Sequence, residues 1–450
     1  MSRAIERLAR ISALALLAAG VCWLRPHGQL HRPGEVPPFL AALAVMCAGY
    51  LIALRVPRFP AIVFWSATIG LRLVLLTMEP GDDLYRYVWE GRVLAAGKNP
   101  YLHAPDAPEL APLHDAMWKK VEHCESSAIY PPLAEICFAA LAKSGGGVLA
   151  FKSAVALADL AICLLLARRF GRTSVLAYAW NPLVLYVFAG GGHCDSLFLL
   201  PLVAAWLAWK NDPVCSADDQ NSKLKSAGVD SEGDTTRFPF YAIFLGVAIA
   251  VKWLALPLLG WVAWREWERG ARRAAVNVLA LGALPLLASW AAVCAWTGEG
   301  TLHLAPGTFV RYARSAEFIP AFIAALIPAT QFLNEIYLLP IALAWAFAIR
   351  RTRTFEHAAE WMFFALFILS PLLHAWYFVW LLPFAIATRN AGSVALTISG
   401  LAYFWVYHRF NIPDGEWRFT WPERCFIWLP FVALFLWSKW RGQPQKVATS

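Results

Sequence analysis

Long apolar stretches, separated by short polar connections, dominate the pattern of the chain. A helix of about 20 apolar residues crosses the hydrocarbon core of a bilayer. Stretches that approach this length lie at residues 8–24, 38–55, 60–78, 147–167, 173–190, 196–210, 238–251, 252–264, 274–296, 333–350, 357–375, 376–389, 392–408 and 425–440. The pattern predicts an all-α, polytopic integral membrane protein with about 12–14 transmembrane helices, in a single membrane domain covering residues 1–450.

Three segments can each be interpreted as a membrane span or as another structure. The pair 238–251 and 252–264 is short for two full spans, so it forms either a re-entrant hairpin or one kinked helix. Residues 130–143 begin with a proline pair, and we expect an interfacial helix there, because a span would place the basic loops on both sides of the membrane. Residues 1–26 have the basic start and apolar core of a signal peptide but no small-x-small cleavage site, so we expect a retained helix.

The positive charges of the short loops set the orientation. Lys and Arg gather on one side, at residues 3–10, 55–58, 168–172, 265–273, 350–353 and 439–446. This side is therefore expected to be the cytoplasm, holding both termini and the polar linker 211–237. The opposite, periplasmic side of the inner (cell) membrane receives the long loop 79–146, the turn 190–195, the loop 297–332 and the segment 409–424.

Composition supports a membrane protein and excludes two other classes. Hydrophobic residues make up 59% of the chain and charged residues 15%, with a mean hydropathy of +0.51. The net charge of +9 does not indicate a nucleic-acid partner, because the basic residues flank apolar stretches. Nine cysteines without a CxxC pair argue against structural zinc, while a disulfide among the outer Cys124, Cys137 and Cys194 stays open.

The most polar stretch at a membrane boundary is Gly81–Tyr101, GDDLYRYVWEGRVLAAGKNPY. Asp82 and Asp83 directly follow the third apolar stretch. A carboxylate in this position can serve as a general base for a hydroxyl at the interface, although a solvated helix end explains it too. The same run carries several charged and aromatic side chains: Arg86, Tyr87, Glu90 and Arg92. Asp83, Tyr87 and Glu90 share one helical face, and the two arginines are candidate phosphate ligands.

Other outer or intramembrane polar residues have a structural and a functional interpretation. His193 and Asp195 lie in the glycine-rich turn GGGHCD, where a histidine is more often a packing or capping residue than a ligand. Lys252 interrupts an apolar run, which marks a functional candidate unless it snorkels to the interface. His374 and Tyr377 lie at the outer end of a helix, where an aromatic belt explains Tyr377 equally well.

The stretch DDLYRYVWEGRVLAAGKNPY, followed by IYPPLAEICFA at 129–139, resembles a known pattern. It is similar to the first outer loop of the GT-C superfamily of membrane glycosyltransferases, in particular the bacterial polyprenol-phosphate-hexose-dependent mannosyltransferase-like family. The runs AWNPLVLYVFAGGGHCDSL at 179–197, VKWLALPLL at 251–259 and AWYFVWLLPF at 375–384 resemble the same group. The resemblance implies a GT-C-like fold with a long first outer loop, 79–146, that holds the catalytic site.

The resemblance also implies a reaction and roles for residues. It implies transfer of a hexose, with mannose as the first candidate, from a polyprenyl-phosphate donor to a lipid or glycan acceptor in the cell envelope. The transfer is expected to invert the configuration at the anomeric carbon. Asp83 matches the catalytic aspartate that precedes Gly-x-x-Pro-Tyr, with Asp82 as its neighbour. Substrate contacts are expected from Arg86, Tyr87, Glu90, Arg92, Tyr130, His193, Asp195, Lys252, His374 and Tyr377.

No motif fixes a cofactor. We expect no obligatory metal; if Mg²⁺ or Mn²⁺ binds, Asp82 and Asp83 are the expected ligands, with His193 beside them. Arg311 and Arg314 in the loop 297–332 are candidate phosphate contacts, but a solvated or interfacial face is favoured. The alternative functions are a lipid or glycan transporter or flippase, which the absence of sequence repeats disfavours, and a non-catalytic scaffold of an envelope complex.

Overall fold

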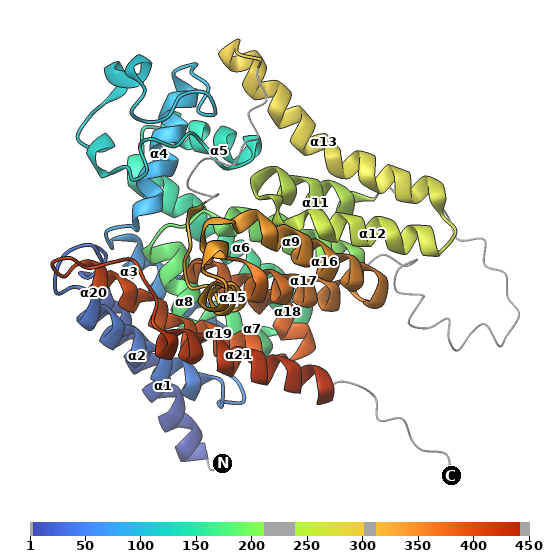
Figure 1. Ribbon diagram of the computed structural model, residues 1–450. Coiled ribbons are helices and arrows are strands. Elements are labelled where there is room, and N and C mark those ends of the chain that lie inside the picture. The colour runs from blue at the N-terminus through green and yellow to red at the C-terminus, as the bar shows by residue number, and fades with distance from the viewer. Residues whose placement is uncertain (1–2, 211–238, 301–311, 442–450) are drawn as a thin grey trace, which may run out of the picture.

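The computed structural model describes residues 3–210, 239–300 and 312–441, and these form an all-α bundle (Figure 1). The α-helices are α1 (Arg3–Leu24), α2 (Val36–Ala53), α3 (Ala61–Leu76), α4 (Asp82–Ala95), α5 (Pro132–Lys143), α6 (Gly147–Phe170), α7 (Arg172–Ala179), α8 (Pro182–Leu185), α9 (Asp195–Lys210), α11 (Phe240–Val251), α12 (Leu256–Glu268), α13 (Arg272–Thr297), α15 (Ile319–Leu326), α16 (Leu338–Arg351), α17 (Phe355–Leu369), α18 (Leu382–Thr388), α19 (Ala391–Ser399), α20 (Trp405–Phe410) and α21 (Trp421–Arg441). Short turns of 3₁₀ or π-helix are η1 (Pro108–Leu113), η2 (Trp118–Lys120), η3 (Tyr186–Gly190), η4 (Trp253–Ala255), η5 (Pro328–Phe332), η6 (Asn334–Tyr337), η7 (Ala375–Leu381) and η8 (Gly400–Phe404). The described residues contain no strand, so the all-α prediction is confirmed. The predicted linker 211–237 and Arg311 lie outside the described residues.

The predicted apolar stretches are helical, but the helices differ in length, and the stretches 173–190, 376–389 and 392–408 are each divided into consecutive shorter helical segments. Within the described ranges, only α1, α2, α6 and α13 are long and apolar enough to cross a membrane alone. A fifth crossing is formed if α7 and the α8–η3 segment, bent by 61° at their junction, count as one span. The helix positions are confirmed, and the number of crossings stays a prediction.

The break at Lys252 resolves one of the open alternatives. α11 ends at Val251, and Lys252 has an extended backbone with φ −154° and ψ 124° before η4 and α12 begin. Pro257 lies in the first turn of α12, where proline is tolerated. The segment is therefore two separate helices, both packed against α13, and not one kinked helix.

A cap of two helices and a long loop stands at one end of the molecule. α4 packs along α5, with the loop that joins them folded around the pair (Figure 1). Gly91 allows this contact, because a Cβ there would lie 2.4 Å from the carbonyl oxygen of Phe138. α5 begins directly after Pro131, so the predicted short helix at 130–143 is confirmed as a helix.

Buried polar contacts fix the end of α3, just before α4 begins. The Lys152 ammonium donates to the carbonyl oxygens of Leu75 and Met78 at the end of α3. The amide of Met78 also donates to the Leu75 oxygen. Carbonyl oxygens at the end of a helix lack the full set of partners found within it, so the lysine satisfies groups that would be costly to bury unpaired. Arg72 and Asp159 form a second, fully buried pair between α3 and α6, with Nε and Oδ2 2.6 Å apart. The end of α3, just before α4, is thereby held against α6.

Candidate functional site

A cavity of about 880 Å³ lies where the α4–α5 cap meets the rest of the bundle. Its lining comes from the connection after α1, the start of α4, the loop before α5, the glycine-rich turn, residues 312–315 and the segments around η7 and α20. Most of the predicted site residues line it: Asp82, Asp83, Arg86, Tyr87, Glu90, Tyr130, His193, His374 and Tyr377. Segments that are distant in sequence thus meet around the predicted carboxylates.

The Asp83 carboxylate lies in this cavity beside His193. Its Oδ2 is 3.2 Å from Nδ1 of His193, and the Tyr87 hydroxyl donates to it at 3.4 Å. The side chain keeps 38% of its surface exposed, so it is open to the cavity. Burial raises the pKa of Asp83, but the His193 hydrogen bond and the charges of His193, His374 and Lys252 outweigh it and hold the pKa below its usual value. Asp83 is therefore ionised at neutral pH and able to accept a proton.

The glycine-rich turn places His193 against Asp83. The amide of Gly81, just before α4, donates to the carbonyl of Gly191 at 2.9 Å. Gly192 has φ +77°, and a Cβ there would lie 2.3 Å from Cδ1 of Leu84. Only glycine fits both the backbone conformation and the space. The turn and the start of α4 therefore form one unit.

Aromatic rings form a second part of the lining. His193 stacks on Trp376 with centroids 4.1 Å apart, and Trp376 stacks on His374 at 4.4 Å. Nδ1 of His374 is 2.7 Å from the Tyr403 hydroxyl. Stacked, flat rings beside a carboxylate suit a sugar ring with its hydroxyl groups.

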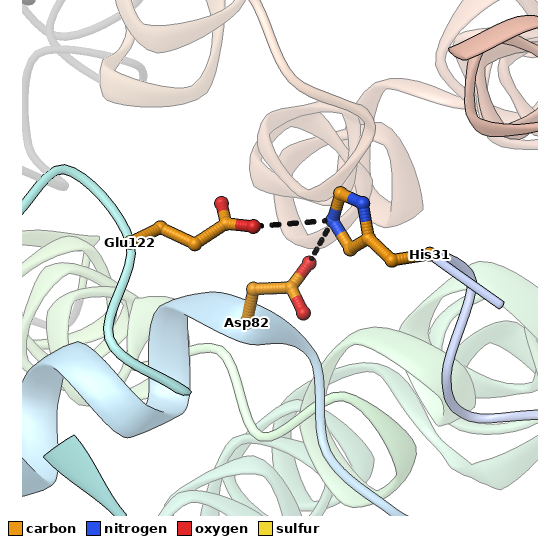
Figure 2. Close-up of side chains that lie close together, drawn as sticks. All are labelled: His31, Asp82 and Glu122. Carbon is orange, nitrogen blue, oxygen red and sulfur yellow. Dashed lines mark hydrogen bonds and ion pairs between the residues drawn. The ribbon is translucent and has the colours of Figure 1, made fainter. Parts of the chain in front are cut away.

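Asp82 points to a different group from Asp83. Its Oδ2 is 2.7 Å from Nε2 of His31, and the same nitrogen is 3.3 Å from Oε1 of Glu122 (Figure 2). Partial burial of the Glu122 side chain, which keeps 50% of its surface exposed, together with the charges of Asp82 and Asp83, raises the pKa of Glu122 to about 7 in spite of His31. One ligand atom from each of the three residues lies within 4.8 Å of the others.

This group changes the expected metal ligands. Among the described residues, His31, Asp82 and Glu122 are the set with ligand-to-ligand distances that suit a metal ion. Asp83 is not part of it, because it is engaged with His193. One imidazole and two carboxylates are a donor set that suits Mn²⁺, so the residues present fit a divalent cation.

Arg86 holds the loop that carries Glu122. Its Nε donates to Glu90 at 2.7 Å, Nη1 donates to the carbonyl of His123 at 2.7 Å, and Nη2 donates to the carbonyl of Ser126. These bonds engage all three guanidinium nitrogens. Arg86 thus positions the cavity wall and has little capacity left for a phosphate.

Arg92, Asp195 and Lys252 do not line the cavity. Arg92 pairs with Asp115 at 2.6 Å on the outer surface. Lys252 and Asp195 form a pair at 2.6 Å, with Asp195 1% exposed, and Trp380 donates to the same carboxylate oxygen at 2.9 Å. The positive charge of Lys252 still contributes to the lowered pKa of Asp83. This ion pair therefore influences the site although neither of its residues lines the cavity.

Several lining residues were not predicted as site residues, above all His31, Glu122 and Tyr403. His31 lies in the connection between the first two apolar stretches, which the charge count assigns to the outer side, and Glu122 lies in the outer loop 79–146. The assignment of His31 and Glu122 to the same side of the membrane was the sequence signal that could have brought them into the predicted site. Cys124, Cys137 and Cys194 are free thiols, so no disulfide forms among them.

Comparison with protein families gives a match over part of the chain. Residues 61–268 match the family model described as "Alpha-(1->6)-mannopyranosyltransferase, N-terminal domain". A search of curated proteins found no match. The matched region runs from α3 to the end of α12 and contains Asp82, Asp83 and the glycine-rich turn. It supports a mannosyl-transfer function, and residues 61–268 are similar to this mannosyltransferase family, which belongs to the GT-C-like group.

Proposed function

We propose that the protein transfers mannose from a polyprenyl-phosphate-linked donor to a hydroxyl group of a lipid or glycan acceptor, with inversion, and that Asp83 is the general base. The observation that carries this proposal is the ionised Asp83 carboxylate, exposed to a cavity of about 880 Å³ and bonded to His193. The family match supports the mannosyl group.

In this reaction one bond forms as another breaks. The acceptor oxygen attacks the anomeric carbon, its proton passes to an Asp83 carboxylate oxygen, and the bond from the anomeric carbon to the phosphate oxygen breaks. The polyprenyl phosphate leaves with the bonding electrons, and a phosphate needs little protonation to do so. One carboxylate base therefore suffices for an inverting transfer.

The charge count supports a periplasmic location for the cavity. Many of its lining residues come from segments that the count assigns to the same outer side, including the loop 79–146, the turn 190–195 and the loop 297–332. Convergence of these segments on one cavity is what a multi-pass inner-membrane protein with an outward-facing site and cytoplasmic termini requires.

The function is tested by offering the purified protein, in liposomes with extracted membrane lipids, a panel of radiolabelled donors. The panel comprises polyprenyl-phosphate mannose, glucose and arabinose, together with a nucleotide-linked mannose. We expect label in a glycan or glycolipid product only from the polyprenyl-phosphate mannose, with product mass identifying the acceptor. Movement of the intact labelled lipid across the bilayer without transfer would favour a flippase instead.

His193 is proposed to keep Asp83 ionised, and this has a pH signature. In His193→Gln the hydrogen bond and charge that lower the pKa of Asp83 are reduced, while the burial that raises it remains. Loss of activity as pH falls should therefore begin at a higher pH than in the wild type, in transfer assays across a pH series. An unchanged acid limb would show that Asp83 is not the titrating base.

Transfer is proposed to need no obligatory metal. If a divalent cation contributes, His31, Asp82 and Glu122 would hold it, and it would supply positive charge near a phosphate. We expect transfer by the wild type to survive treatment with EDTA at more than about half its rate, since charge stabilisation then rests on protein side chains. Activity that disappears with EDTA, returns with Mn²⁺, and no longer responds to Mn²⁺ in Glu122→Gln would contradict this.

A further inference from the structure

The cavity wall contains a guanidinium group whose charge is only partly balanced, that of Arg314. Of the two expected alternatives, a solvated or an interfacial face, the solvated one does not hold for this residue, because its side chain is only 14% exposed. Its Nε lies 3.5 Å from Oε1 of Glu317, and Nη1 donates to the carbonyl of Thr330 at 3.1 Å. Within the part of the chain that the structure describes, Nη2 has no hydrogen-bond partner. A buried, unpaired donor on a charged group is costly unless a ligand completes it.

Glu317 cannot neutralise Arg314 alone, since it is shared. The same Oε1 is 3.1 Å from Nη2 of Arg424, and the Glu317 main-chain carbonyl accepts from Nε of Arg424. The remaining nitrogen of Arg424, Nη1, donates to the carbonyl of Phe419. Among the ion pairs of the described residues, two guanidinium groups thus face one carboxylate, which leaves an excess of one positive charge at the cavity wall.

The segment of Arg314 is tied to the catalytic lining. The amide of Ser315 donates to the carbonyl of Pro371 at 3.1 Å, and the amide of Leu373 donates to the carbonyl of Ser315 at 2.9 Å. These bonds fix Arg314 beside the segment that ends at His374, whose ring stacks on Trp376. The unbalanced charge therefore belongs to the same cavity as Asp83.

Arg314 also borders an apolar surface. Its partner Thr330 lies in η5, and the helix and turns from α15 to α16 expose several large apolar side chains: Phe322, Leu326, Ile327, Phe332, Leu338 and Leu339. A guanidinium group between a polar cavity and an apolar surface suits an anion that carries a long apolar tail.

Arg86 and Arg314 are the arginines in the lining, and no lysine appears there among the described residues. Arg86 uses most of its N–H donors on Glu90 and on main-chain carbonyls. We propose that Arg314 binds the phosphate group of the polyprenyl-phosphate donor, with the tail leaving the cavity along the surface from α15 to η5. This inference rests on the proposed function, of which it names the phosphate-binding residue.

The test measures equilibrium binding of radiolabelled polyprenyl phosphate to the full-length protein in nanodiscs, so no transfer is needed. Arg314→Gln should bind about ten-fold more weakly or worse, which corresponds to the loss of one charge-assisted hydrogen-bonding group. Arg314→Lys, which keeps the charge, should recover part of the affinity. Arg418→Gln, an exposed residue outside the lining, is the matched control and should bind like the wild type.

Two further probes separate the phosphate from the tail and from other lipids. Polyprenol, which lacks the phosphate, should bind equally to the wild type and to Arg314→Gln; an equal loss for both probes would mean that Arg314 only supports the fold. Excess phosphatidylglycerol should not displace the label, and displacement would mean that the site binds membrane headgroups. Unchanged affinity in Arg314→Gln overturns the inference while the donor panel still decides the proposed function, and failure of every donor would leave this binding result standing.

Discussion

Replacing Asp83 by Asn is expected to reduce mannosyl transfer by about 10²–10⁴-fold, the range for loss of a positioned general base. The amide keeps the size of the side chain and can still meet Nδ1 of His193, but it cannot accept the proton of the acceptor hydroxyl. The measurement is the initial rate of label transfer in liposomes, at matched amounts of folded protein.

Asp82→Asn is the matched control for this variant. It removes the same charge one residue away, in the group with His31 and Glu122, and does not touch the His193 contact. We expect a much smaller loss than for Asp83→Asn. Equal losses in both variants, or a full rate in Asp83→Asn, would remove Asp83 from its assigned role.

Replacing Lys252 by Met is expected to destabilise the protein by about 3–5 kcal/mol, because it leaves the Asp195 carboxylate buried without its partner. The double variant Lys252→Met with Asp195→Asn removes both charges and should recover most of that loss. The measurement is the temperature of thermal unfolding in detergent for the wild type, both single variants and the double variant.

The same variants decide between a structural and a substrate-binding Lys252. If the pair only supports the site, stability and transfer recover together in the double variant. A double variant that is stable but transfers no mannose would mean that the lysine contacts the donor directly. The location of the pair behind the lining favours the first outcome.

Sequence patterns predicted the helices and part of the site for physical reasons that can be named. Apolar stretches at membrane length give helices whatever their neighbours are, so the positions of the helices from α1 to α3, from α6 to α13 and from α16 to α21 followed. In contrast, α15 lies in a segment predicted as a loop. The charge count assigned both Asp83 and His193 to the outer side of the membrane. Two residues at the same end of one helix bundle can lie close together, so a shared site was a reasonable prediction.

The pairings within the site depend on tertiary packing and were beyond the sequence pattern. Lys252 stood out as an unpaired intramembrane charge, and only the fold brought Asp195 to it from another helix. Arg86 had the residue type of a phosphate ligand, but the loop before α5 folds back and occupies its donors. Arg314 was expected on a solvated or interfacial face, whereas the structure shows a buried guanidinium group with an unpaired donor. This follows from the fold, in which Glu317 is shared between Arg314 and Arg424.

The central claim is a single displacement with one carboxylate base, and the configuration of the product tests it most directly. The wild-type protein is given polyprenyl-phosphate mannose of known anomeric configuration, and the linkage in the product is determined by NMR. Inversion at the anomeric carbon is the predicted result, and with the alpha linkage in the family description it requires a β-linked donor. Retention would require a covalent mannosyl intermediate on a second carboxylate and would contradict the mechanism proposed for Asp83.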